Sequence, residues 1–194
     1  FSTFLLDYNN DGRLDIFVAN WGQFDVVLAD RVAGQATSPR DRPILYHNDG
    51  EGGFSDVTEE AGLLRALGTM SGVAADVDND GWIDLFAGQL WKNEGGKKFV
   101  LAKDSKAPGG EVLWGDFDND GHVDVFQFTG AGSLHRNKGD GTFEKVEFPK
   151  LPTINSRGAS WLDINNDGLL DLYVGGYEIW TKTVHPDAIY INQG

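Results

Sequence analysis

The stretch DVDNDGWID at residues 76–84 decides the fold, because the chain repeats it three more times with small changes. The other copies are DYNNDGRLD at 7–15, DFDNDGHVD at 116–124 and DINNDGLLD at 163–171. All follow the pattern D-x-[DN]-N-D-G-x-x-D, in which oxygen-bearing side chains alternate along a backbone that Asn and Gly allow to turn tightly. Two carboxylates about 4 Å apart repel by roughly 4 kcal/mol at an effective dielectric of 20. Because a hard cation removes this repulsion, the pattern predicts a cation-binding loop.

The composition agrees with an acidic, folded protein. The 194 residues include 30 Asp and Glu against 16 Lys and Arg, a formal net charge of −14, and the four copies hold a large share of these acids. No basic run is present to neutralise phosphates, which argues against a nucleic-acid partner. The chain lacks Cys, which excludes disulfides and thiolate metal sites. It also lacks an apolar run of about 20 residues, which argues against insertion into a membrane.

Short apolar stretches flank each copy and predict β-strands. They are FSTFLL and IFVAN around the first copy, GVAA and LFAGQ around the second, EVLWG and VFQFT around the third, and GASWL and LYVGG around the fourth. Each aspartate copy is therefore expected to connect two strands of a hairpin rather than two helices.

A second pattern alternates with the first. It consists of an aromatic residue or His, one residue, Asn, one residue and Gly, followed by Phe: YHNDGEGGF at 46–54, WKNEGGKKF at 91–99 and HRNKGDGTF at 135–143, with YINQG at 190–194 as an incomplete copy. The glycines predict a second hairpin. Two hairpins give four antiparallel strands, which is one blade of a β-propeller, so the fold expected is all-β with about four blades.

The spacing of the copies is uneven, and it predicts insertions at about 20–43, 59–72 and 175–188 in a single propeller domain over 1–194. The second of these has Leu at roughly helical spacing, which suggests a helical turn. Both ends of the sequence cut the pattern within a repeat. A partial propeller is the favoured interpretation, and a closed ring of four blades is the alternative.

The ligand set differs from that of an EF-hand, which needs a Glu at position 12, where this chain has Val18, Ala87, Gln127 and Val174. We expect side-chain oxygens at positions 1, 3, 5 and 9 and a backbone carbonyl at position 7. The predicted ligands are Asp7, Asn9, Asp11, Arg13, Asp15, Asp76, Asp78, Asp80, Trp82, Asp84, Asp116, Asp118, Asp120, His122, Asp124, Asp163, Asn165, Asp167, Leu169 and Asp171. About four Ca²⁺ ions would bind, more tightly at the two middle copies because those have four carboxylates. Magnesium is a weaker candidate because it keeps its water.

The alternation of the two patterns resembles the FG-GAP or VCBS repeats of integrin-α-like β-propellers. The string ILYHNDGEGGFSDVTEEAGL at 44–63, leading to SGVAADVDNDGWIDLF, is similar to the cartilage acidic protein and ASPIC/UnbV group. The resemblance implies a secreted propeller in which calcium has a structural role and which serves adhesion or ligand binding.

Other residues offer little catalytic chemistry. The four histidines, His47, His122, His135 and His185, are not paired with a nucleophile or metal-ligand pattern, so we expect structural or surface roles for them. Trp114 and Trp161 each precede the first Asp of a copy by two residues and are expected to pack between blades. Trp21 and Trp180, in the predicted insertions, are the better candidates for partner contact.

Three functions are therefore open. The first is a non-enzymatic, calcium-binding extracellular or cell-surface module for a protein or glycan ligand, without nucleic-acid binding or membrane insertion. The second is a propeller enzyme that acts on polysaccharides or resembles quinoproteins. The third is a subunit that self-associates through unfilled terminal strands into fibres or surface layers.

Overall fold

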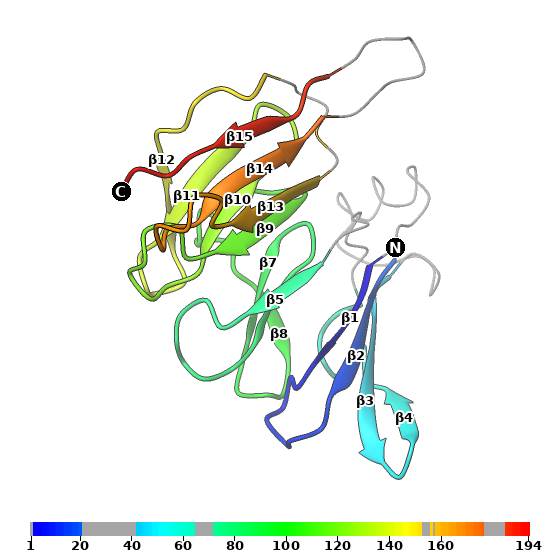
Figure 1. Ribbon diagram of the computed structural model, residues 1–194. Helices are drawn as coiled ribbons and strands as arrows, with labels where there is room; N and C mark the ends of the chain where they lie inside the picture. Colours follow the sequence, from blue (N-terminus) through cyan, green and yellow to red (C-terminus); the bar gives the residue numbers. More distant parts are fainter. Residues whose placement is uncertain (1, 21–41, 65–71, 153–155, 157, 177–184) are drawn as a thin grey trace. The chain divides into compact units, whose positions relative to one another are not determined.

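The computed structural model describes residues 2–20, 42–64, 72–152, 156, 158–176 and 185–194 (Figure 1). In these residues the chain is all-β. Its strands form antiparallel sheets in which neighbours in the sequence are neighbours in the sheet. The chain divides into two compact units, 1–104 and 105–194, and each unit holds two sheets.

Unit 1 contains two four-stranded sheets. The first consists of β1 (Ser2–Leu6), β2 (Asp15–Ala19), β3 (Ile44–Gly50) and β4 (Gly53–Asp56), which lie side by side in Figure 1. The second consists of β5 (Val73–Ala75), β6 (Asp84–Phe86), β7 (Leu90–Asn93) and β8 (Phe99–Leu101). In both sheets an aspartate copy joins the first two strands, and its last Asp opens the second strand.

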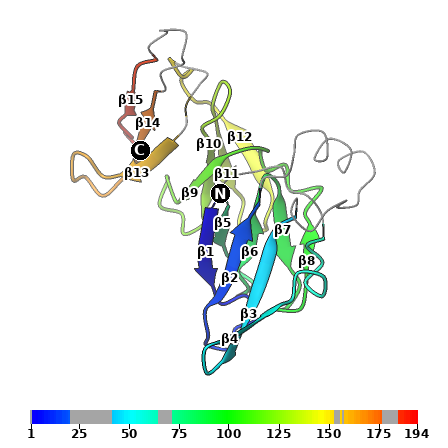
Figure 2. The same ribbon diagram turned by 90° about the vertical axis from the view of Figure 1, so that its right-hand side faces the viewer.

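Unit 2 repeats this plan. Its first sheet consists of β9 (Val112–Gly115), β10 (Asp124–Gln127), β11 (Ser133–Asn137) and β12 (Phe143–Val146). Its second sheet has three strands, β13 (Gly158–Leu162), β14 (Asp171–Gly175) and β15 (Ala188–Tyr190), which are seen together in Figure 2. Strand β15 is therefore an edge strand in the described part of the chain.

The predicted all-β, blade-like architecture is confirmed, with strands where the flanking apolar stretches predict them. The described residues have the arrangement of a partial β-propeller, in which three blades have four strands and the fourth has three. That the whole chain forms a single domain stays a prediction. Residues 21–41, 65–71 and 177–184, which make up at least half of each predicted insertion at 20–43, 59–72 and 175–188 and include Trp21 and Trp180, lie outside the described residues. No helix among the described residues is both long and apolar enough to cross a membrane.

The core of each unit lies between its two sheets. In unit 1, inward-facing residues of β2, β3 and β6 such as Phe17, Leu45 and Leu85 are fully buried and form one cluster with Phe99 of β8. In unit 2, Phe126 of β10 packs with Leu172 and Val174 of β14. Burying an aliphatic or aromatic side chain of this size contributes about 1.5–3 kcal/mol, so these contacts hold the sheets of each unit together.

Hydrogen bonds to the aspartate copies join the sheets at equivalent points in both units. Asn93 Nδ2 donates to the carbonyl of Tyr8 at 2.8 Å, and Asn192 Nδ2 donates to the carbonyl of Phe117 at 2.7 Å. The backbone N–H of Phe99 donates to the carbonyl of Ala61 at 2.9 Å. The Asn of the second pattern therefore links a blade to the aspartate copy of the preceding blade within a unit.

Candidate metal-binding loops

The four aspartate copies form loops of one backbone conformation, here called loop 1 (7–15), loop 2 (76–84), loop 3 (116–124) and loop 4 (163–171). The Asn at position 4 and the Gly at position 6 have positive φ in every loop, for example 55° at Asn79 and 88° at Gly81. Gly adopts this conformation without steric cost, and Asn tolerates it better than most residues. The N-D-G core of the pattern therefore supplies the two residues that curl the loop.

Carboxylates at positions 1 and 5 hold the curl from inside. In loop 2, Asp76 accepts the backbone N–H groups of Asp80 at 3.1 Å and of Gly81 at 2.9 Å, and Asp80 in turn accepts the N–H of Trp82 at 2.9 Å. The corresponding bonds are present in loops 1, 3 and 4. These bonds direct the first and fifth side chains toward the interior of the same turn.

The carboxylate at position 9 is the buried anchor of each loop. Asp84 is 1% exposed, and its oxygens accept the backbone N–H groups of Val77 at 3.1 Å and of Asn93 at 2.7 Å. One side chain thus ties the loop to the third strand of its own blade, and Asp15, Asp124 and Asp171 make the same two bonds.

Burial makes the anchor costly to ionise in the two middle loops. It raises the pKa of Asp84 and of Asp124 to about 6, although the N–H bonds oppose the shift. Neighbouring carboxylates of the same loop, Asp78 and Asp80 in loop 2, raise the pKa further. A bound divalent ion would remove this penalty.

Loops 2 and 3 bring carboxylate oxygens together closely enough to share one ion. One oxygen each of Asp76, Asp78 and Asp84 lie within 4.8 Å of one another, as do those of the residue set Asp116, Asp118 and Asp120. At position 3, Oδ1 of Asp78 and Oδ1 of Asp118 are buried and have no hydrogen-bond partner. Buried acceptors are nearly always bonded, so these two atoms fit the coordination of a hard cation.

Loops 1 and 4 differ at position 3, where an amide replaces the carboxylate. Asn9 Nδ2 donates to Oδ2 of Asp11 at 3.1 Å, and Asn165 Nδ2 donates to Oδ2 of Asp167 at 2.8 Å. In loop 1 the guanidinium of Arg13 also lies 2.7 Å from Asp11. The amide therefore neutralises part of the repulsion that a fourth carboxylate would create. The backbone carbonyls of Arg13, Trp82, His122 and Leu169 stay predicted ligands, as does the full set at each loop.

Sequence reasoning missed the residue that precedes the Asn of the second pattern, which in three blades lies against the aspartate loop. Lys92 Nζ forms an ion pair with Oδ2 of Asp78, and this contact raises the pKa of Lys92. Arg136 Nε lies 2.6 Å from Oδ2 of Asp118. His47 Nδ1 lies 3.1 Å from Oδ1 of Asp15, so this histidine belongs to the loop 1 site. Locating these residues from sequence requires the strand register.

The aromatic predictions have mixed outcomes. Trp161 packs between the two sheets of unit 2 as expected, with its ring 6.2 Å from that of Phe126. A Cβ added at Gly115 would lie 2.4 Å from Trp161, so this glycine makes room for the indole. The ring of Trp114 lies 5.9 Å from that of Phe143 in its own sheet, and its packing between blades stays a prediction.

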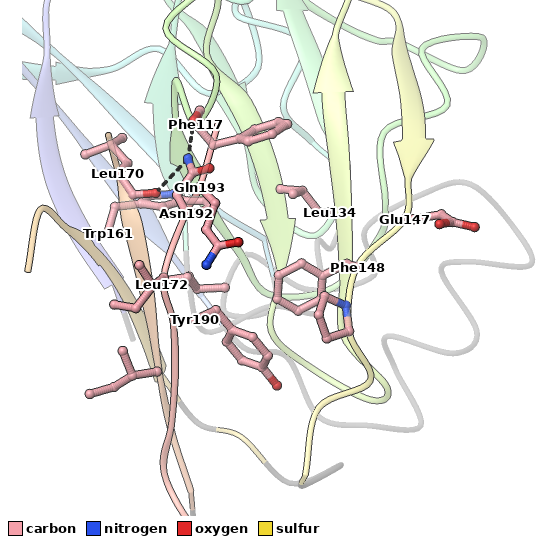
Figure 3. Close-up of a pocket in the computed structure, with 13 residues that line it drawn as sticks. Phe117, Leu134, Glu147, Phe148, Trp161, Leu170, Leu172, Tyr190, Asn192 and Gln193 are labelled. Atoms are coloured by element: carbon pink, nitrogen blue, oxygen red, sulfur yellow. Dashed lines mark hydrogen bonds between the residues drawn. The ribbon is translucent and has the colours of Figure 1, made fainter. Parts of the chain in front are cut away.

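A mostly apolar cavity of about 540 Å³ opens in unit 2 between β15 and the segment after β12 (Figure 3). Phe117, Phe148 and Tyr190 surround it, and the rings of Phe148 and Tyr190 are 4.8 Å apart. In unit 1 the corresponding place beside Tyr8 holds Phe99, the first residue of the fourth strand β8. The cavity therefore corresponds to the position of a fourth-strand Phe in the three-stranded blade.

Comparison with known proteins gives a family and a fold. A model of the FG-GAP-like repeat matches residues 7–87 and 116–174, which include all four loops. Among solved structures, the chain is similar to an Agrocybe aegerita lectin that specifically recognises non-reducing terminal N-acetylglucosamine, with a TM-score of 0.54 and 19% identity. The match covers 98% of this chain and 52% of the lectin, so the chain spans about half the length of that protein. No curated protein sequence matches the chain.

Proposed function

Because the chain belongs to the FG-GAP-like repeat family, we propose that its four aspartate loops bind Ca²⁺ and that the ions stabilise a module for adhesion or ligand binding. The observation that carries the proposal is the buried, unbonded Oδ1 atom of Asp78 and of Asp118 among converging carboxylates. A short loop crowded with oxygen donors favours calcium over magnesium, because magnesium gives up its hydration reluctantly.

The ions have a structural role in this proposal. In each loop the position 9 anchor bonds its own blade, and loops 1 and 3 each accept one bond from the Asn of the next blade, at the carbonyls of Tyr8 and Phe117. Neutralising the carboxylates would therefore stabilise blade contacts as well as the loop. At free calcium 100-fold above Kd, each site would add about 2.7 kcal/mol to the free energy of unfolding.

The test compares thermal unfolding of the wild-type protein in millimolar calcium and in EDTA, with calorimetric titration of calcium into the metal-free protein. We expect a higher Tm in calcium and saturable binding. The variant Asp78→Asn should lose affinity at loop 2, whereas Asp104→Asn, which removes an exposed carboxylate outside the loops, should behave like wild type. Equal Tm values with and without EDTA would contradict the proposal.

An extracellular or cell-surface location follows from the same proposal, since loops of this kind in extracellular modules bind calcium at around 10⁻⁴–10⁻³ M. The ligand class we propose is a protein or a glycan, bound without catalysis. The Agrocybe aegerita lectin makes N-acetylglucosamine-terminated glycans the first probes to use in an array. Binding without turnover supports this function, and turnover of a bound glycan would favour the enzyme alternative.

A specific observation favours head-to-tail assembly as a second candidate function. In unit 1, the second blade contacts loop 1 of the first blade through two residues. Phe99 of its fourth strand packs against Tyr8, and Asn93 donates to the carbonyl of Tyr8. Blade 1 offers an unused copy of these groups, because Phe54 is 45% exposed and Asn48 Nδ2 bonds only its own loop, at Leu14. Blade 4 offers the receiving surface, with Leu162 and Ile164 40% and 43% exposed. The occupant we propose for each surface is a second copy of this chain.

Sedimentation velocity over a range of concentrations tests the assembly. The wild-type protein should form oligomers that grow with concentration, because a heterologous contact does not close on itself in a dimer. Phe54→Ser should shift the protein to monomer, and Val100→Ser, which changes another exposed apolar residue of unit 1, should not. A wild-type protein that stays monomeric at all concentrations removes this function.

A further inference from the structure

The residue before each second-pattern Asn lies in the third strand in blades 1 to 3 and directly after it in blade 4, and its chemistry matches position 3 of the loop of the same blade. Where the loop has a carboxylate, Asp78 or Asp118, the strand supplies a permanent cation, Lys92 or Arg136. Where the loop has an amide, Asn9 or Asn165, the strand supplies His47 or Ile191. Both units contain one pair of each kind. The type of strand residue therefore follows the side chain at position 3 of the loop and not the order of the blades along the chain.

This pairing evens out the charge of the loops. Loops 2 and 3 each combine four carboxylates with one cation, whereas loop 4 combines three carboxylates with none, so all three have the same net charge. Loop 1 has three carboxylates and the guanidinium of Arg13 and is less negative. Counting carboxylates alone therefore misjudges the field that an entering ion meets.

We propose that Lys92 and Arg136 are tethered counter-ions that hold loops 2 and 3 together without metal and compete with the ion for the position 3 carboxylate. The inference rests on the proposed binding of calcium by the loops. Each base occupies Oδ2 of its partner Asp and leaves the buried Oδ1 without a bond. An entering ion would be coordinated by Oδ1 and would have to displace the Lys or Arg side chain from Oδ2. This displacement lowers the affinity of the loop for the ion.

The surroundings of the bases allow this displacement. The side chains of Lys92 and Arg136 are 36% and 41% exposed, and the guanidinium of Arg136 also lies 5.6 Å from the centre of the Phe117 ring. A cavity of about 430 Å³, lined by Asp80, Trp82, Lys92 and Glu94, adjoins loop 2 and gives the ammonium room to move aside. The carboxylate of Glu94, which pairs with Lys98, borders the same cavity.

Two consequences follow. Calcium affinity should be similar at loops 2 and 4 despite their different numbers of carboxylates. Without metal, loop 2 should stay ordered while loop 4 loosens, because the ion pair of Lys92 with Asp78 ties loop 2 to its third strand and Ile191 can form no such pair. The order of affinities expected from carboxylate count alone, with both middle loops tighter than loop 4, is the opposing result.

The principal experiment replaces the base with a side chain of similar length and no charge. In Lys92→Met, calcium should bind loop 2 about tenfold more tightly, because one positive charge beside the ion is removed. The matched control is Lys98→Met, since Lys98 lies in the same hairpin and pairs with the exposed Glu94 rather than a loop carboxylate. The control should remain within about twofold of wild type, the range expected for an exposed pair.

Loop 2 can be followed separately by terbium luminescence. Trp82 occupies position 7 of the loop and should sensitise an ion bound there, and Trp82→Phe gives the contribution of the other tryptophans to subtract. Calcium competition against terbium then gives the affinity of loop 2 in each variant. Affinity in Lys92→Met that equals or falls below wild type overturns the inference.

A second measurement needs no variant. In EDTA, hydrogen exchange at the amides of Asp80 and Gly81 in loop 2 should be at least about tenfold slower than at Asp167 and Gly168 in loop 4. Equal exchange overturns the inference while leaving calcium binding intact. Absence of any calcium effect on exchange in all four loops would instead reject the proposed function, so the two failures are distinguishable.

Discussion

Loops 2 and 4 have the same backbone conformation and the same net charge, but different side chains set that charge in each. In loop 2 a fourth carboxylate, Asp78, faces a lysine from the third strand, and in loop 4 an amide, Asn165, bonds within the loop. The shared backbone comes from Asn and Gly with positive φ, which both loops have. In this fold, therefore, different residues set the conformation of a loop and its charge. The conformation is set by residues within the loop, and the charge is set partly by a residue on a neighbouring strand.

The largest effect should come from the anchor common to both loops. Asp84→Ala removes the acceptor of two backbone N–H groups, those of Val77 and Asn93, which would stay buried and unbonded. We expect a loss of about 4 kcal/mol in the free energy of unfolding, measured by urea denaturation in EDTA. Asp76→Ala, at the half-buried first position, should cost less than half as much. Equal losses would show that position 9 is not the anchor.

The second-largest loss of stability should come from removing the bond between blades, and the equivalent Asn of blade 1 provides a control. Asn93 is 3% exposed and bonds both its own loop and the carbonyl of Tyr8, so Asn93→Ala should cost about 3 kcal/mol. Asn48 occupies the same motif position in blade 1 but bonds only Leu14 through its amide nitrogen, so Asn48→Ala should cost about 1 kcal/mol. Equilibrium unfolding of both variants checks the difference. Similar losses would contradict a separate contribution from the contact between blades.

The fold was largely predictable from the sequence because its signals are local. The N-D-G core specifies the loop, the apolar stretches beside it specify the strands, and the Phe of the second pattern marks β8 and β12. The site was predictable only in part. Lys92 and Arg136 approach their loops through the pairing of the second and third strands, at separations along the chain that vary between blades. No local pattern joins them to Asp78 or Asp118, so their role required the structure.

The pH dependence should have opposite signs with and without metal. Burial raises the pKa of Asp84 and Asp124 to about 6, from 3.8, so the folded metal-free protein binds protons more strongly than the unfolded chain between these values. In EDTA, their contribution to stability should therefore be present below about pH 4 and decrease by about 2 kcal/mol per group as the pH rises through 6. In calcium, stability should rise over the same interval, because the ion competes with the protons. Urea unfolding at pH 4, 5 and 6 gives both slopes, and slopes of the same sign would contradict the account.

The smallest effect concerns the shared backbone. Gly81 has a φ of 88°, and a Cβ added there meets no atom within 4 Å, so the cost of Gly81→Ala is backbone strain alone. We expect about 1–2 kcal/mol, and the same loss for Gly168→Ala in loop 4, measured as a change in the free energy of unfolding. A loss confined to one of the two loops would indicate that their backbones are not equivalent in solution.

A crystal structure grown in millimolar calcium would show directly whether the four loops are calcium sites. We expect an ion in each loop, bonded to the side-chain oxygens of positions 1, 3, 5 and 9 at about 2.3–2.6 Å. In loops 2 and 3 we also expect Lys92 and Arg136 to have moved off Asp78 and Asp118. Loops without ion density at saturating calcium, with both bases still paired to their carboxylates, would contradict the proposed binding of calcium.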